Sequence, residues 1–164
     1  MSNDQTIQNL QTALEMEMTA GHQYQLHAQV LDDWGLDILA DKMREEMQEE
    51  IGHSDLFMER IIFLGGTPEI RFQKQPRKAE SLVDMFKMDL ADEEEAIAVY
   101  TKAAQAAAET GDIGSRTLFE KIVLDEEGHK SWLELQISLI GRLGEPAYSA
   151  KFVSVGGETE EDEG

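Results

Sequence analysis

The second half of this sequence repeats the first at an offset of 76 residues, and the repeat limits the folds that the chain can form. Glu17 corresponds to Glu93, and Glu50 corresponds to Glu126. The same offset relates Leu14 to Leu90, Ala20 to Ala96, Tyr24 to Tyr100, Gly35 to Gly111, Gly52 to Gly128, His53 to His129 and Gly65 to Gly141. A random scatter of acidic residues would not keep its tyrosines and glycines in register. We therefore expect two similar structural units that pack against each other.

Four long stretches carry apolar residues at spacings of three and four, with more Ala, Leu, Met, Glu and Gln than β-branched residues. This pattern predicts four helices. The expected helices are Thr6–Trp34, Asp37–Leu64, Ser81–Glu109 and Ile113–Leu143. Glycine follows the first three of them, where it can adopt the left-handed conformation that ends a helix.

The connections between the four helices indicate how they are arranged. Two are short, whereas the third runs from Gly65 to Glu80, holds two of the three prolines and needs no structure of its own. The sequence therefore predicts an all-α fold, a ferritin-like antiparallel four-helix bundle with a long crossover between helices 2 and 3. Residues 145–153 are expected to form a short fifth helix. Residues 1–153 should be one domain, and residues 154–164 an acidic, disordered tail.

Composition excludes several classes of function. The formal net charge of -20 would repel nucleic-acid phosphates, so no nucleic acid is expected as a partner. The absence of cysteine excludes disulfides, zinc-thiolate sites and iron-sulfur clusters. No basic stretch with an apolar segment opens the sequence and no apolar run is long enough to span a bilayer, so we expect a cytoplasmic protein without membrane contact.

Two short motifs of the form E-x-G-H carry the candidate chemistry. A carboxylate and an imidazole three residues apart on a helix project from one face, as in Glu50 with His53 and in Glu126 with His129. One such pair is common on a solvated surface. In an antiparallel hairpin, however, residues equidistant from the turn lie side by side, which places Glu17 beside Glu50. The repeat does the same for the second hairpin, so four glutamates and two histidines should meet as in di-iron carboxylate proteins.

Metal ions would explain such a cluster. Four buried carboxylates without metal would be very costly, whereas two divalent cations neutralise their charge. Oxygen and imidazole ligands suit iron or manganese, and zinc could bind without redox chemistry. Iron is the first choice because oxidation by dioxygen or peroxide explains paired metals. The alternatives are a metal-binding protein without turnover and a di-iron oxygenase.

Several further residues say less about function: two tyrosines, the two remaining histidines and the glycines of the two motifs. Tyr24 lies two turns after Glu17 and could donate a hydrogen bond to the metal ligands, or it could be an ordinary core residue. Tyr100 has the same relation to Glu93. The glycines of the two motifs indicate either close helix contact or local slack. His22 and His27 are expected at the surface or at an interface.

These residues resemble the bacterioferritin family over almost the whole chain. The likeness is carried by Gln23-Tyr24, Leu26-His27-Ala28, Asp33-Trp34-Gly35-Leu36, Glu59-Arg60-Ile61 and Asp125-Glu126-Glu127-Gly128-His129. The resemblance implies a ferroxidase that oxidises Fe(II) at Glu17, Glu50, His53, Glu93, Glu126 and His129. It also implies bridging roles for Glu50 and Glu126, Tyr24 close to the site, and a 24-subunit shell of twofold dimers that stores ferric mineral. Glu45 and Glu49 would face the interior and pass iron inward, or simply form a solvated face.

One position departs from the family. The family binds haem at a twofold interface through a methionine directly after the bridging glutamate of the second helix, and Ile51 stands there. Isoleucine has no lone pair for iron, and Met47, one turn earlier, is the nearest substitute. Haem b is therefore in doubt. The chain could be haem-free or could share a mixed shell with a second, methionine-bearing bacterioferritin subunit.

Overall fold

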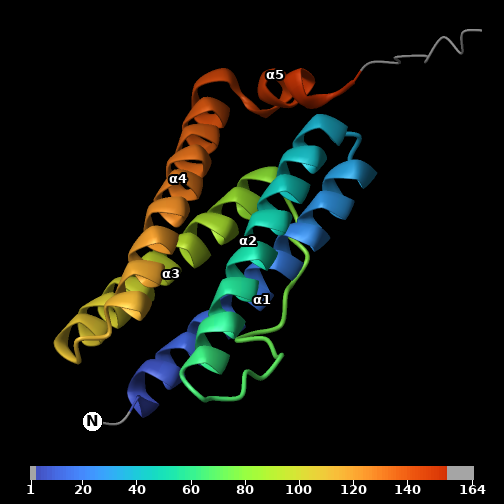
Figure 1. Ribbon diagram of the computed structural model, residues 1–164. Coiled ribbons are helices and arrows are strands. Elements are labelled where there is room, and N and C mark those ends of the chain that lie inside the picture. The colour runs from blue at the N-terminus through green and yellow to red at the C-terminus, as the bar shows by residue number, and fades with distance from the viewer. Residues whose placement is uncertain (1–2, 155–164) are drawn as a thin grey trace, which may run out of the picture.

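The computed structural model describes residues 3–154, and every regular secondary-structure element in that segment is a helix (Figure 1). The helices are α1 (Asp4–Asp33), α2 (Asp37–Phe63), α3 (Leu82–Glu109), α4 (Ile113–Leu143) and α5 (Glu145–Ser149), followed by a 3₁₀ turn (Ala150–Phe152). The predicted all-α bundle is confirmed, and the ends of its four long helices are within two residues of the predicted ones. The predicted fifth helix is only five residues long before the 3₁₀ turn. Most of the predicted tail, residues 155–164, lies outside the described segment, so the domain bounds stay a prediction.

Two antiparallel hairpins form the bundle. α1 packs along α2, α3 packs along α4, and the hairpins face each other through α1 with α3 and through α2 with α4. Gly35 and Gly111 stand at equivalent turns with φ of 82° and 75°, a conformation that glycine adopts without steric cost. The helix ends predicted there are confirmed. α5 lies across the end of the bundle opposite the N-terminus (Figure 1).

The apolar core is divided into two clusters. Leu31 and Phe86 belong to the cluster beside α5, whereas Leu14, Phe57 and Phe119 belong to the cluster at the opposite end. The level between the two clusters is occupied by buried polar side chains. Among residues 3–154, no helix combines the length and the apolar character that crossing a membrane requires.

The long crossover between α2 and α3 is held against α1 by polar side chains spaced one or two helical turns apart. The amides of Gln11 and Gln23 each exchange two hydrogen bonds with a backbone unit of the crossover, Gln11 with Glu69 at 3.0 and 3.0 Å and Gln23 with Arg77 at 2.8 and 3.0 Å. Between these two points, the Gln73 N–H donates to the Thr19 hydroxyl at 2.9 Å. The crossover therefore needs no regular structure, as predicted, because α1 provides its hydrogen-bond partners.

His27 is not at the surface, and that prediction was wrong. Its side chain is fully buried, with Nδ1 3.1 Å from Asp89 Oδ2 and Nε2 2.9 Å from the Gln23 amide nitrogen. The same amide nitrogen donates to the Arg77 carbonyl, so its second hydrogen is available to His27 Nε2. α1 is covered by α3 and by the crossover, which buries a wider stripe than a single hairpin would. His22 is partly exposed and lies 3.0 Å from the Gln25 side chain.

Asp112 caps α4 and joins it to α2. Its carboxylate accepts hydrogen bonds from the Ser115 N–H at 3.0 Å and from the Arg60 guanidinium at 2.7 Å. Desolvation alone would raise the pKa of Asp112, but the bonds from Ser115 and Arg60 outweigh it and hold this pKa below its usual value. A lowered pKa in the folded state stabilises the fold above the unfolded pKa of about 3.9, and this contribution is lost as the pH falls through the folded value.

We expect Asp112→Ala to lower the free energy of unfolding by about 1–2 kcal/mol at pH 7, because the cap and the ion pair are both lost. The difference from the wild type should shrink below pH 4. Urea unfolding at pH 7 and pH 3, at one protein concentration, measures both effects. Asp112→Asn keeps a capping oxygen without the charge, so it should lose less. An equal deficit at both pH values would contradict this account.

Candidate metal centre

The structure brings the six candidate ligands together at the polar level between the two apolar clusters. Each of the four long helices contributes. The side chains are Glu17 from α1, Glu50 and His53 from α2, Glu93 from α3, and Glu126 and His129 from α4, each at most 6 % exposed. Two overlapping groups of ligand atoms result, with all atoms of a group within 4.8 Å of one another. One group is Glu17, Glu50, His53 and Glu126, and the other is Glu50, Glu93, Glu126 and His129.

Glu50 and Glu126 belong to both groups and lie between the two histidines. Glu126 Oε1 is 3.0 Å from His53 Nδ1, and its Oε2 is 3.2 Å from His129 Nδ1. Glu50 Oε1 lies 3.6 Å from His53 Nδ1 and 3.2 Å from His129 Nδ1. Separations of this size suit atoms that share an ion at about 2.1 Å. The geometry is that of two adjacent cation sites with two carboxylates in common.

Unpaired polar atoms show that the residues fit a pair of metal ions. Buried polar atoms normally have hydrogen-bond partners. Within the described residues, eight buried side-chain nitrogen or oxygen atoms have none, and seven of them belong to the six candidate ligands. They are Glu17 Oε2, Glu50 Oε1, His53 Nδ1, Glu93 Oε2, both oxygens of Glu126, and His129 Nδ1. These are lone-pair atoms that cations would satisfy. The eighth is Glu46 Oε2, which is 2.6 Å from His129 Nε2.

The electrostatics of the cluster indicate the same need for positive charge. Burial, together with the charges of neighbouring glutamates, raises the pKa values of Glu50 and Glu93 well above the usual value. Burial would lower the pKa of His53, but the carboxylates of Glu126 and Glu17 outweigh it and raise this pKa to about 11. The pKa of His129 is raised in the same way, chiefly by Glu126. Without metal, protons supply the positive charge that the carboxylates require.

The outer nitrogen of each histidine faces further carboxylates. His53 Nε2 is 3.0 Å from Asp125 Oδ2, and His129 Nε2 is 2.6 Å from Glu46 Oε2. Such contacts leave Nδ1 for a metal and fix the orientation of the ring. The sequence pattern does not distinguish Glu46 and Asp125, because α2 and α4 are rich in acidic residues. Only the register between the facing helices α2 and α4 decides which carboxylates lie beside each histidine.

The two tyrosines cross between the hairpins. Tyr24 of α1 donates a hydrogen bond to Glu93 Oε1 at 2.6 Å, and Tyr100 of α3 donates to Glu17 Oε1 at 2.9 Å. Burial and the adjacent carboxylates raise the pKa values of both phenols well above the usual value, so both stay protonated donors. Each tyrosine therefore orients a glutamate of the opposite hairpin rather than one of its own.

Glu45 and Glu49, the two residues predicted to pass iron inward, lie at different distances from the centre. Glu49 Oε2 lies 2.7 Å from His129 Nε2, with its side chain 42 % exposed. Glu45 is 74 % exposed beside Lys42, so the structure does not bring it to the centre. Roles in iron transfer stay a prediction for both. The prediction of close helix contact at Gly52 and Gly128 was wrong, because an added Cβ at either position would meet nothing within 4 Å.

The position at which the resemblance implies a haem-binding methionine holds Ile51. Ile51 is 40 % exposed, and its Cδ1 lies 3.0 Å from where a Cβ on Gly21 would stand. Its side chain thus lies over α1 and has no atom that could bind iron. Met47 is partly buried against the core cluster beside α5.

The fold and the buried cluster define the class of the protein. The sequence pattern of the ferritin-like domain family matches residues 7–143. Bacterioferritin of Rhodobacter capsulatus is 43 % identical over 143 residues, which cover 87 % of this chain and 89 % of that protein. Bacterioferritin of Brucella melitensis is 38 % identical over 142 residues, covering 87 % and 88 %. The chain belongs to the bacterioferritin family, within the ferritin-like class.

Solved structures agree with this assignment. Bacterioferritin of Rhodobacter capsulatus superposes with a TM-score of 0.90 at 40 % identity, covering 93 % of this chain and 96 % of that one. That structure has a metal-free dinuclear site and haem iron. Mycobacterium tuberculosis bacterioferritin BfrA gives a TM-score of 0.90 at 36 % identity, with the same coverage.

Proposed function

We propose that the protein is an iron-storage subunit with ferroxidase activity, oxidising Fe(II) to Fe(III) at the six-residue centre. The observation that carries this proposal is the set of seven unpaired, buried lone-pair atoms on four glutamates and two histidines. They form two adjacent sites with shared carboxylates. Dioxygen accepts two electrons when it is reduced to peroxide, and two ferrous ions side by side supply one each. The family to which the chain belongs supports iron as the metal.

Each residue has a distinct part in this proposal. Glu50 and Glu126 would bridge the two ions, Glu17 and His53 would complete one site, and Glu93 and His129 would complete the other. Asp125 and Glu49 hydrogen-bond the outer nitrogens of His53 and His129, and the Glu46 carboxylate lies beside that of His129, so that each Nδ1 would face the metal. The four carboxylates balance two divalent cations and remain to bind the ferric products.

The assembly belongs to the proposal as well. We propose a shell of 24 subunits built from twofold dimers, with ferric mineral stored inside and dioxygen or peroxide as the oxidant, as the family resemblance implies. The relatives support an oligomeric assembly and iron as the substrate. Ile51 favours a haem-free shell or a mixed shell with a second subunit that provides a methionine. The cavity lined by Glu17, Glu50 and Glu93 measures about 20 Å³, room for a water molecule or an ion, which argues against an organic substrate and a di-iron oxygenase. A cytoplasmic location stays a prediction from the sequence.

Addition of ferrous iron in air to the metal-free protein tests the proposal. Ferric absorbance should rise much faster than in buffer up to about two irons per chain, one for each site. Further additions should produce a mineral that elutes with a large shell in size-exclusion chromatography. Oxidation no faster than in buffer would leave a metal-binding or structural subunit instead. A Soret band in the purified protein would show that Ile51 does not prevent haem binding.

We expect Tyr100→Phe to weaken metal binding about tenfold, because Glu17 then loses the donor that orients it. Titration of the metal-free protein with Co²⁺, followed by visible absorbance, measures this affinity. Tyr148→Phe is the matched control, since its hydroxyl bonds Gln136 in a different part of the core. Equal losses in the two variants would show a general effect of removing a buried hydroxyl.

A further inference from the structure

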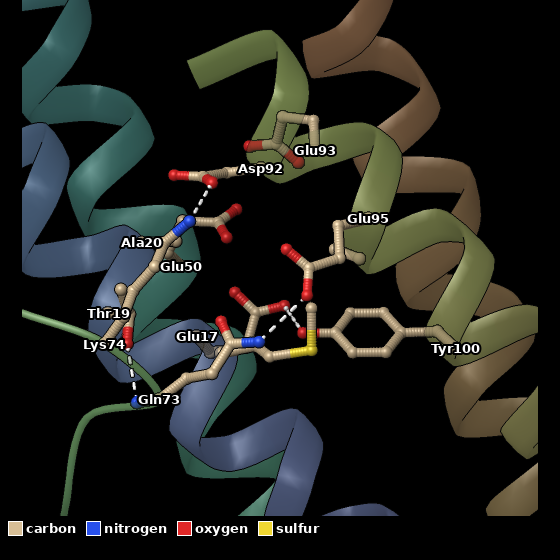
Figure 2. Close-up of a pocket in the computed structure, with 12 residues that line it drawn as sticks. Glu17, Thr19, Ala20, Glu50, Gln73, Lys74, Asp92, Glu93, Glu95 and Tyr100 are labelled. Carbon is tan, nitrogen blue, oxygen red and sulfur yellow. Dashed lines mark hydrogen bonds and ion pairs between the residues drawn. The ribbon is translucent and has the colours of Figure 1, made fainter. Parts of the chain in front are cut away.

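A small cavity connects the centre with the crossover. It measures about 20 Å³ and lies between α1, α3 and crossover residues 73–74 (Figure 2). Its inner wall includes Glu17, Glu50 and Glu93, which are at most 3 % exposed and each of which has an oxygen without a hydrogen-bond partner. This cavity is therefore a place where a cation could approach the unpaired ligand atoms from outside.

Two side chains of the crossover close the outer side of this cavity. Lys74 Nζ is 2.5 Å from Asp92 Oδ1, and Gln73 Nε2 donates to Glu95 Oε1 at 3.0 Å (Figure 2). Both acceptors are on α3 and close in sequence to Glu93. The closure is at the surface, because Lys74 is 51 % exposed and Asp92 is 25 % exposed.

The closing side chains can move without the backbone that carries them. The Gln73 N–H donates to Thr19 Oγ1 at 2.9 Å and to the Glu15 carbonyl at 3.3 Å, so α1 holds the crossover in place. The side chains of Gln73 and Lys74 are long and rotate freely once their contacts break. An ion pair as exposed as that of Lys74 adds little to stability and opens readily. Rotation of two side chains is thus enough to open the cavity.

We propose that this cavity is the cation entrance to the metal centre and that Lys74 controls it. In the closed state the Lys74 ammonium stands where an incoming divalent cation would be received, beside Asp92. When Lys74 rotates away, Asp92 and Glu95 are free to bind the hydrated ion and pass it to Glu93 and Glu50. The inference rests on the proposed function, because it assigns a route to that same centre.

Uptake of Co²⁺ by the assembled, metal-free protein tests the entrance without any oxidation step. Lys74→Met removes the ammonium but keeps the length of the side chain. We expect Co²⁺ binding, followed by stopped-flow absorbance, to become about two- to five-fold faster, the range set by loss of an exposed ion pair. Lys78→Met is the matched control, since it removes the same charge from an exposed position of the crossover that does not line the cavity. The number of Co²⁺ bound at saturation should not change in either variant.

A double variant tests the receiving carboxylate. Lys74→Met with Asp92→Asn has an open entrance but no charge at Asp92, so its uptake should be slower than that of Lys74→Met. Equal rates for Lys74→Met and Lys78→Met would overturn the control by Lys74. A double variant as fast as Lys74→Met would overturn the role of Asp92. If the wild type bound no Co²⁺ at all, the metal centre itself would be wrong, which is a different failure from unchanged rates at normal stoichiometry.

Discussion

Replacing Glu50 and Glu126 together by alanine is expected to abolish ferrous iron oxidation above the rate in buffer. Both carboxylates face both histidines, so their loss removes the shared ligands of the two sites at once. Loss of an outer partner of a ligand already lowers activity or metal affinity 10–100-fold, and loss of two ligands should exceed about 100-fold. Initial rates of ferric absorbance after aerobic addition of Fe(II) measure the effect.

A matched control separates this effect from a change in charge. Glu59→Ala with Glu127→Ala removes one exposed carboxylate from α2 and one from α4, the same helices and the same charge. It should oxidise iron at the wild-type rate. The metal-free Glu50→Ala, Glu126→Ala protein should be less stable than the wild type, since its two buried histidines lose the Glu126 carboxylate that pairs with both of them. An inactive variant that is also unfolded would need the isosteric Glu→Gln pair, and activity retained in that pair would contradict the bridging roles.

The second large effect is a release of protons on metal binding. The neighbouring carboxylates raise the pKa of His53 to about 11 and raise that of His129 as well, so both rings are protonated at pH 7 in the metal-free state. A metal ion binds the unprotonated Nδ1, and each ring must give up its proton. Two ions per chain should therefore release at least about two protons, with more from Glu50 and Glu93, whose pKa values are also raised.

This release makes metal affinity strongly dependent on pH. Because the pKa values of the ligands are raised, protons compete with the metal more strongly as the pH falls. The metal affinity therefore decreases as the solution becomes more acidic. Each released proton changes the equilibrium constant about tenfold per pH unit. Titration with Zn²⁺ in weakly buffered solution containing an indicator dye counts the protons directly. Binding of two ions with no change in dye absorbance would contradict the protonated state that we assign to the histidines.

Local sequence determined the helices and their order. Gly35 and Gly111 end α1 and α3 where the sequence predicts, because only glycine adopts positive φ there without strain. Spacing on the helices also selected the candidate ligands. Glu50 and His53 must share a face whatever the tertiary structure, and the antiparallel turn places Glu17 at their level. The relative positions of these ligands depend only on one helix or on one hairpin, so the sequence alone was sufficient to predict them.

Contacts between hairpins were beyond the reach of the sequence. The burial of His27 could not be predicted from the residues around it in the sequence, since its side chain is covered by the crossover and α3, which pack on α1. The sequence predicted that Tyr24 could reach the metal ligands, but it did not show that the ligand it bonds is Glu93 of the other hairpin. Glu46 and Asp125 could not be distinguished from the other acidic residues beside them. In each case the rotation and axial offset between the packed helices select the partner.

The sequence by itself thus determined the bundle, its crossover and the six residues that meet at one level. The repeat carries this information, since residues equally distant from a turn are brought side by side by any antiparallel hairpin. Tertiary structure alone decided which atoms face each other, which carboxylates orient the histidines, and that Gln73 and Lys74 close a cavity beside the centre. Those contacts depend on side-chain packing between segments far apart in the chain, for which local spacing holds no information.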